Sequence, residues 1–378
     1  MENQKIIPPG FKKESLLKLM QEHHLAGVLL TTAENVYYTT GYPTLPGSGN
    51  PIIFALKNQF PYYVYISADG KVTLVGWMGA LNGVDFAADD SRPFFNHDTA
   101  LEELGNVLKE NLNSGPATLG VESTCPMIVL DLMKTALEAH TPALFNVDPL
   151  MTQLRLIKSP AEIELIKRST AITEEAVSEL SETVHVGITR RQLIQDAKIR
   201  MMMHGADAID HVTAGFGAAN LEVELEQTLE PNQLVQLDLG ASVRGYVSDN
   251  RRILYSGEMT DEIRKPHEKV CAIIDEMGLA LKPGALFSHI YQMAFDLFTK
   301  EDLIPLFMNA GHTMGLQTEE VWLIEGNDIE VQPGMVMNIE VYTPHITGEP
   351  IGDEETFVVT PTGSERITQL PRAIKSVK

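Results

Sequence analysis

Residues 237–249 read LDLGASVRGYVSD, and this stretch decides how the second half of the chain is expected to fold. An apolar run leads into Asp238, which is the pattern of a strand that ends in an acid. Residues 240–245 predict a hairpin turn, after which residues 246–254 return as a second strand beside the first. We therefore expect Asp249 to lie near Asp238. Two carboxylates at that distance repel each other unless a cation lies between them, although each acid alone could equally cap a turn.

Three later segments add residues of the same chemical type. Residues 311–316 read GHTMGL and place a histidine, His312, between glycines whose backbone can approach a ligand closely. Residues 336–342 read VMNIEVY and place one acid among apolar neighbours, where a carboxylate needs a partner. Residues 352–356 read GDEET, an acidic run that by itself is typical of a solvated turn. Taken alone, a histidine such as His312 is more often an ordinary core or surface residue than a ligand. Taken together, four carboxylates and one imidazole suit two divalent ions such as Mn²⁺, Co²⁺, Fe²⁺ or Zn²⁺.

Length and composition narrow the class of protein. The chain has 378 residues, which predicts two domains, and 44% of them are hydrophobic, so a large core can be buried. The formal net charge of −22 argues against nucleic acid or an anionic membrane as the partner. The two cysteines, Cys125 and Cys271, are far apart, which excludes a disulfide framework and predicts a reducing, cytoplasmic location. The N-terminus lacks the pattern of a signal peptide, and no apolar run is long enough to span a membrane.

The order of predicted elements gives the domain organisation. Helices and strands alternate over residues 1–150, which predicts a small N-terminal α/β domain. A second domain is expected over residues 155–378. It opens with a helix whose start is marked by the N-cap Ser159, by Pro160 at the first helical position and by Glu162 of a capping box. The predicted fold class is therefore α/β (α+β) in two domains.

The order Asp, Asp, His, Glu, Glu resembles that of the pita-bread metallopeptidase family, which includes methionine aminopeptidase, aminopeptidase P, prolidase and the non-metal relative creatinase. The eleven-residue spacing of Asp238 and Asp249 matches the family pattern. The resemblance covers nearly the whole chain. The other matching segments are Gly311 to Leu316, Pro333-Gly334-Met335, Ile339-Glu340, Glu354-Glu355-Thr356, the helix start from Arg155 to Ile163, and an N-terminal segment with Tyr37, Tyr38, Gly41 and Tyr42.

The resemblance implies a fold, a cofactor and roles for particular residues. The fold is a C-terminal domain of two pseudo-symmetric halves around a curved antiparallel sheet. The cofactor is a pair of divalent ions, most often manganese or cobalt, and the assembly is a homodimer. Glu340 would be both a ligand and the general base for water. The implied metal ligands are Asp238, Asp249, His312, Glu340 and Glu354.

The chain departs from the family pattern around the substrate. Proline-specific relatives carry a histidine some seventeen residues before the first Asp, and residues 217–224 contain none. A second family histidine is Glu319 here, and an arginine two residues before the last glutamate is Gly352. Arg251 replaces a threonine, and on a strand it shares a face with Asp249. We expect Arg251, Glu319 and Glu222 to contact the substrate. The metal site is expected to be intact, but cleavage of ordinary Xaa-Pro dipeptides is expected to be weak or absent.

Three functions follow from these observations. The first is a metal-dependent hydrolase that resembles Xaa-Pro dipeptidase or aminopeptidase P and cleaves an amide C–N bond of a small peptide-like substrate with an activated water. The second keeps the fold and metals but acts on a small non-peptide metabolite, as an amide or amidine hydrolase or a lyase, because the substrate-binding histidines are absent. The third is a binding protein that has kept the fold without catalysis, which the complete set of ligand residues disfavours.

Overall fold

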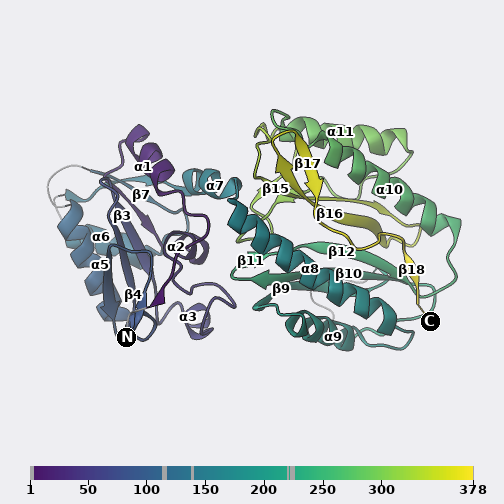
Figure 1. Ribbon diagram of the computed structural model, residues 1–378, viewed down its shortest axis with the longest axis horizontal. Helices are drawn as coiled ribbons and strands as arrows, with labels where there is room; N and C mark the ends of the chain where they lie inside the picture. The colour runs from purple at the N-terminus through teal and green to yellow at the C-terminus, as the bar shows by residue number, and fades with distance from the viewer. Residues whose placement is uncertain (1–3, 113–116, 138–139, 219–220, 222–225, 378) are drawn as a thin grey trace. The chain divides into compact units, whose positions relative to one another are not determined.

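The structure is a computed structural model, and it describes residues 4–112, 117–137, 140–218, 221 and 226–377. The chain divides into two compact units, Met1–Arg155 and Leu156–Lys378. Both contain helices and sheets, so the predicted mixed α/β class is confirmed (Figure 1). Among the described residues, none of the helices combines the length and the apolar character needed to cross a membrane.

The N-terminal unit is built on a mixed six-stranded sheet with the strand order β6-β4-β3-β2-β7-β8. Helices α5 and α6 pack on the sheet through an apolar core that includes Leu104, Met133 and Tyr65. The elements are β1 (Gln4–Lys5), α1 (Lys13–Glu22), β2 (Gly27–Leu30), α2 (Ala33–Thr40), α3 (Ile52–Ala55), β3 (Tyr63–Ser67), β4 (Val72–Trp77), α4 (Met78–Leu81), β5 (Val84–Asp85), β6 (Asp90–Phe94), α5 (His97–Leu112), β7 (Thr118–Val121), α6 (Met127–Leu137), β8 (Ala143–Asn146) and α7 (Asp148–Leu156).

The C-terminal unit consists of two halves, each with two long helices and a five-stranded sheet. The first half contains α8 (Pro160–Thr183), α9 (Arg190–Met203), β9 (Ala208–Phe216), β10 (Leu234–Val243), β11 (Tyr246–Val247) and β12 (Asn250–Tyr255). The second half contains α10 (Asp261–Ala280), α11 (Phe287–Lys300), β13 (His312–Thr313), β14 (Val321–Trp322), β15 (Val336–Pro344), β16 (Pro350–Thr360) and β17 (Gly363–Arg366), while the last strand, β18 (Lys375–Ser376), joins the first sheet beside β12.

Local sequence explains where the first helices of this unit begin. The Ser159 side chain accepts a hydrogen bond from the Glu162 backbone N–H, and the Glu162 carboxylate accepts one from the Ser159 N–H, which completes the capping box expected there. Thr189 and Gln192 form the same reciprocal arrangement at the start of α9. These caps pair backbone donors that the first turn of a helix leaves without partners.

The prediction of a hairpin turn over residues 240–245 is wrong in its length, because the turn is shorter. Strand β10 continues through Gly240 to Val243, and the turn is the pair Arg244-Gly245, with φ angles of 48° and 79°. Two consecutive left-handed residues form a tight turn whose twist matches that of the flanking strands. The return strand is also interrupted after Val247, and it resumes at Asn250 to pair again with β10. Asp249 lies in this interruption.

Candidate metal centre

Alternation along the strands decides which acids face the site. On β10, Val235, Leu237 and Leu239 belong to the apolar core shared with α8 and α9, so Asp238 points to the opposite face of the sheet. On β15, Met337, Ile339 and Val341 likewise face the core of the second half, so Glu340 points away from it. Glu354 lies directly across from Glu340 in the β15–β16 ladder. The two halves therefore present their acids on the faces that their helices leave uncovered.

In the first half, a histidine and an arginine lie on either side of Asp238. His211 Nε2 is 3.1 Å from Asp238 Oδ1 and 3.3 Å from Asp249 Oδ1. Arg251 lies opposite Asp238 in the β10–β12 ladder, and its Nη1 is 3.3 Å from Asp238 Oδ2. Arg251 is only 5% exposed and also donates to Gln236 over 2.6 Å. It lies behind Asp238, in contact with one of the carboxylates expected to bind metal.

In the second half, His312 lies between two of the expected ligands. Its Nε2 is 3.3 Å from Asp249 Oδ2 and 3.9 Å from Glu340 Oε1. The Tyr342 hydroxyl donates to Glu340 Oε2 over 2.8 Å and is also hydrogen-bonded to Glu354. Asn309 and Asn338 donate amide hydrogens to Glu340 and Glu354 respectively. Neutral donors thus hold both glutamates in place.

Without a cation, the carboxylates of the site repel one another. Burial, and then repulsion from Asp238 and Asp249, raises the pKa of Glu354 well above its usual range. Burial also raises the pKa of Glu340, although His312 opposes that shift. Burial would raise the pKa of Asp249 too, but hydrogen bonds from His211 and His312 hold it well below its usual value. The histidines therefore supply part of the positive charge that this cluster requires.

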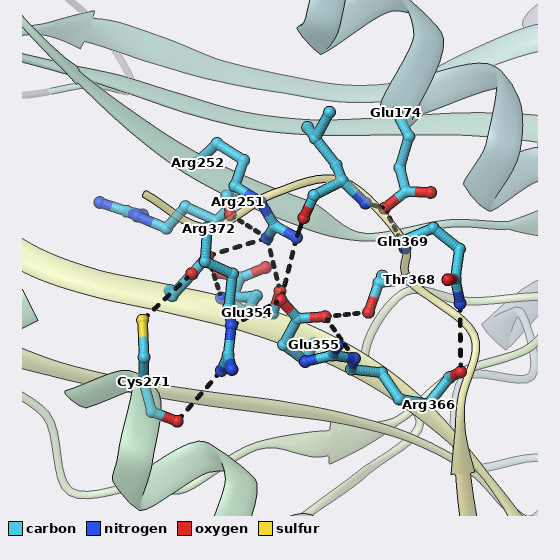
Figure 2. Close-up of polar contacts among 12 residues, drawn as sticks. Glu174, Arg251, Arg252, Cys271, Glu354, Glu355, Arg366, Thr368, Gln369 and Arg372 are labelled. Atoms are coloured by element: carbon cyan, nitrogen blue, oxygen red, sulfur yellow. Dashed lines mark hydrogen bonds and ion pairs between the residues drawn. The ribbon is translucent and has the colours of Figure 1, made fainter. Parts of the chain in front are cut away.

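A second layer of charge lies on the helix side of β16. Asp353 and Glu355, the neighbours of Glu354, point to the opposite face from it. Arg252 donates to both, over 2.8 Å to Asp353 and 2.9 Å to Glu355. Figure 2 shows Arg252 reaching toward this layer, and Thr368 also donates to Glu355 there. These contacts fix the strand that carries Glu354.

The expected ligands converge on one open cleft of about 440 Å³. Glu319 is exposed and also lines the cleft, whereas Glu222 lies outside the described residues. Arg251 does not line the cleft. The lining residues are Asp210, His211, Thr213, Asp238, Asp249, His312, Thr318, Glu319, Glu340 and Glu354.

The sequence interpretation assigned no role to two residues of the site, His211 and Tyr342. His211 belongs to none of the family motifs, and Tyr342 is the last residue of the stretch VMNIEVY that was considered only for Glu340. Antiparallel pairing of β9 with β10 is what brings His211 toward Asp238. The register that does so is a property of the folded sheet.

The donor set fits a pair of divalent ions. Four acids, of which Asp249 and Glu354 are buried, meet imidazole nitrogens in a cleft that opens to solvent. Oxygen and imidazole ligands suit first-row divalent metals, and cations would relieve the repulsion among the buried carboxylates. His211, Asp238 and Asp249 already offer three ligand atoms within 4.8 Å of one another.

Comparison with known proteins assigns the family of both units. Residues 164–361 match the model of metallopeptidase family M24, and residues 12–157 match the Creatinase/Prolidase N-terminal domain. An Xaa-Pro dipeptidase from Pyrococcus furiosus is 25% identical over 370 residues, which cover 96% of this chain and 98% of that protein. An Xaa-Pro dipeptidase from Pyrococcus horikoshii is 25% identical over 372 residues, with 96% and 98% covered.

Solved structures show the same fold. The prolidase from Pyrococcus horikoshii OT3 superposes with a TM-score of 0.81 at 22% identity, over 96% of this chain and 99% of that one. The X-Pro aminopeptidase from Thermotoga maritima MSB8 superposes with a TM-score of 0.80 at 20% identity, over 97% and 99%. The expected pita-bread architecture is thus confirmed. The chain belongs to metallopeptidase family M24, and it is a metal-dependent hydrolase.

Proposed function

We propose that this chain is a dinuclear metallopeptidase that cleaves small peptides at an Xaa-Pro bond. The observation that carries the proposal is the convergence of Asp238, Asp249, His312, Glu340 and Glu354, from both halves of the C-terminal unit, on one cleft. The curated relatives named Xaa-Pro dipeptidase, which match along nearly their whole length, support the choice of substrate. Neither comparison favours the alternative of a non-peptide metabolite.

Each residue of the cleft has a proposed task. The five ligand residues would hold two divalent ions, which when bound polarise a carbonyl and lower the pKa of a water molecule. Glu340 would accept the proton of that water, since its carboxylate lines the cleft and is held by Tyr342. Glu319, which lines the cleft, would contact the substrate. Arg251 and Glu222 stay proposed substrate-binding residues only because they stand where the chain departs from the family pattern, and Arg251 lies behind Asp238 and not on the cleft wall.

Several finer properties belong to the proposal as well. We propose manganese or cobalt as the metal and a homodimer as the assembly, both on the family resemblance. A cytoplasmic location is consistent with two free cysteines, Cys125 and Cys271.

Metal content tests the site. The chain, stripped with a chelator and then dialysed against Mn²⁺ or Co²⁺, is expected to retain two ions when measured by elemental analysis. Asp249→Ala and His312→Ala are each expected to lower that number, because each removes a ligand atom. An unmodified chain that takes up neither metal would refute the proposal.

Steady-state kinetics on a panel of Xaa-Pro dipeptides, with Mn²⁺ present, tests the substrate. Residues 217–224, where proline-specific relatives carry a histidine, contain none, and loss of one hydrogen-bond donor to a transition state typically costs about 10²–10³ in turnover. We therefore expect measurable but slow cleavage. A kcat/KM of about 10⁴ M⁻¹s⁻¹ or more, ordinary for an enzyme on its own substrate, would show that this histidine is dispensable here. No cleavage of any dipeptide by the metal-loaded chain would refute the proposed substrate.

A further inference from the structure

We infer that His211 is an additional metal ligand, so that the centre holds one imidazole at each of its two metal positions. The inference rests on the proposed dinuclear function and goes beyond it, since the family pattern contains a single histidine ligand, His312. It begins from the two oxygens of Asp249. Oδ1 lies 3.3 Å from His211 Nε2, and Oδ2 lies 3.3 Å from His312 Nε2. Asp249 thus has one imidazole on each side.

The orientation of the His211 ring is typical of a metal ligand. Its Nδ1 lies 2.9 Å from Asp210 Oδ2, which leaves Nε2 facing Asp238 and Asp249. Histidines that bind metals usually donate their other ring N–H to a carboxylate, which fixes the tautomer and strengthens the donor nitrogen. The Thr318 hydroxyl donates to the same Asp210 oxygen and holds it in place. Asp210, His211 and a cation held by Asp238 and Asp249 would therefore form a triad of carboxylate, histidine and metal.

A β-bulge creates this arrangement. In the β9–β10 ladder Gly240 pairs with His211 and Ala241 pairs with Ile209, so that Asp210 has no partner on β10. Side chains of adjacent residues in a regular strand point to opposite faces, and Asp210 could not then reach the neighbouring ring. The extra residue bends the strand and redirects its side chains, as bulges beside active sites commonly do.

Gly240 provides the space for the ring. A methyl group at this position would lie 2.5 Å from two atoms of the His211 ring and equally close to the Ser248 carbonyl oxygen. Only a residue without Cβ leaves the imidazole beside Asp238. The glycine, the bulge and Asp210 are three separate features that place one nitrogen at the carboxylates.

Proton NMR of the Co²⁺-loaded chain tests the inference without any measurement of activity. An imidazole bound to Co²⁺ through Nε2 keeps an exchangeable Nδ1 proton whose signal is strongly shifted by the metal. We expect two such signals in H₂O that vanish in D₂O. His211→Asn is expected to remove one of them and His312→Asn the other. His204→Asn is the matched control, because His204 also contacts two carboxylates, Glu175 and Glu179, away from the cleft.

Calorimetric titration with Co²⁺ gives the second readout. Removal of the hydrogen-bond partner of a metal ligand usually weakens metal binding by about 10–100-fold, and we expect a loss in this range for one of the two sites in Asp210→Ala. His211→Asn removes the ligand itself, so its loss at that site is expected to be at least as large. Because Asp210→Ala keeps the imidazole, it provides an independent test if the histidine variant does not fold.

Two results separate this inference from the proposed function. If the chain binds two ions but shows one shifted signal, which His312→Asn removes and His211→Asn does not, the inference is wrong and the dinuclear function stands. Unchanged affinities in His211→Asn would lead to the same conclusion. If the unmodified chain binds no Co²⁺, both fail.

Discussion

The guanidinium of Arg251 lies over the ring of Tyr342, with its central carbon 4.6 Å from the ring centroid. Both side chains are buried against the metal-site carboxylates, and Tyr342 also donates to Glu340. The stacked pair therefore places a fixed positive charge behind Asp238 and a neutral donor beside Glu340. In this arrangement the arginine competes with metal ions for the same negative charge.

Removal of that charge is expected to tighten metal binding. In Arg251→Met, the carboxylate of Asp238 loses its cationic neighbour, and a divalent ion roughly 8 Å away loses a repulsion worth about 1 kcal/mol even at the dielectric of bulk water, so the affinity is expected to rise by at least roughly fivefold. Titration of the stripped protein with Mn²⁺ measures the effect. Arg264→Met, which removes an exposed arginine of α10, is the control and is expected to leave the affinity unchanged. Weaker binding in Arg251→Met would mean that the arginine organises the ligands instead.

Gly352 is expected to resist substitution because of Tyr342. A methyl group at Gly352 would lie 1.9 Å from the Tyr342 ring, which faces it across the β15–β16 ladder. We expect Gly352→Ala to reduce the free energy of unfolding by about 1–3 kcal/mol, the usual cost of overpacking. Urea denaturation followed by Trp322 fluorescence, in a Trp77→Phe background, measures the second unit alone. Gly363→Ala is the control, since no atom lies within 4 Å of its added methyl.

A double-mutant cycle shows whether the ring is the cause. In a Tyr342→Ala background the same Gly352→Ala change is expected to cost much less, because the clashing atoms are gone. An equal cost in both backgrounds would place the strain in the backbone.

Arg252 is expected to be among the most important residues for stability. It is 4% exposed and bonds to Asp353 and Glu355, which are both buried. Arg252→Met removes the cation that bonds to both acids, while Arg366 and Arg372 stay within 4 Å of Glu355. Loss of one partner of a buried ion pair typically costs about 3–5 kcal/mol. The same denaturation measurement applies. Arg264→Met again serves for comparison, because it bonds to Asp261 and Glu268 at the surface, where ion pairs contribute at most about 1 kcal/mol. Similar losses in the two variants would contradict the prediction.

His267 makes the second unit sensitive to acid. Burial, followed by the charges of Arg252 and Arg372, lowers the pKa of His267 to about 4. The unfolded chain takes up a proton near the ordinary value of about 6.5, and the folded chain does not until about 4. The stability that His267 contributes is therefore full above about pH 6.5 and declines as the pH falls to about 4, at up to about 1.4 kcal/mol per unit.

The difference in the free energy of unfolding between wild type and His267→Gln isolates the titration of His267, since most other groups titrate in both proteins. Burial raises the pKa of Asp353, which faces His267, to about 7, and that opposing titration is common to both. Denaturation of the metal-free proteins from pH 7 to pH 4.5 is expected to show the stability advantage of wild type shrinking. The exposed His289→Gln is expected to follow wild type. A difference that stays constant with pH would show that His267 titrates normally.

Much of the metal centre is determined by the sequence. Asp238 and Glu340 each lie between apolar neighbours on a strand, so alternation predicts that these two acids face away from the core. Glu354, in its acidic run, is identified only by the family resemblance. The turn residues between Asp238 and Asp249 equally predict two antiparallel strands. The helix starts at Ser159 and Thr189 follow from local hydrogen bonding, which needs no distant partner. Such features depend on residues only a few positions apart.

Only the tertiary structure decided the position of His211, the place of the turn at Arg244-Gly245 and the stacking of Arg251 on Tyr342. The position of His211 depends on the register between β9 and β10, in which one bulged residue moves a side chain from one face of the sheet to the other. The stacking of Arg251 on Tyr342 joins strands whose contacting residues are 91 positions apart in the sequence, and it requires that residue 352 lack a side chain. Local sequence carries no signal for either, because strand register and contacts between the two halves are set by the packing of the whole unit.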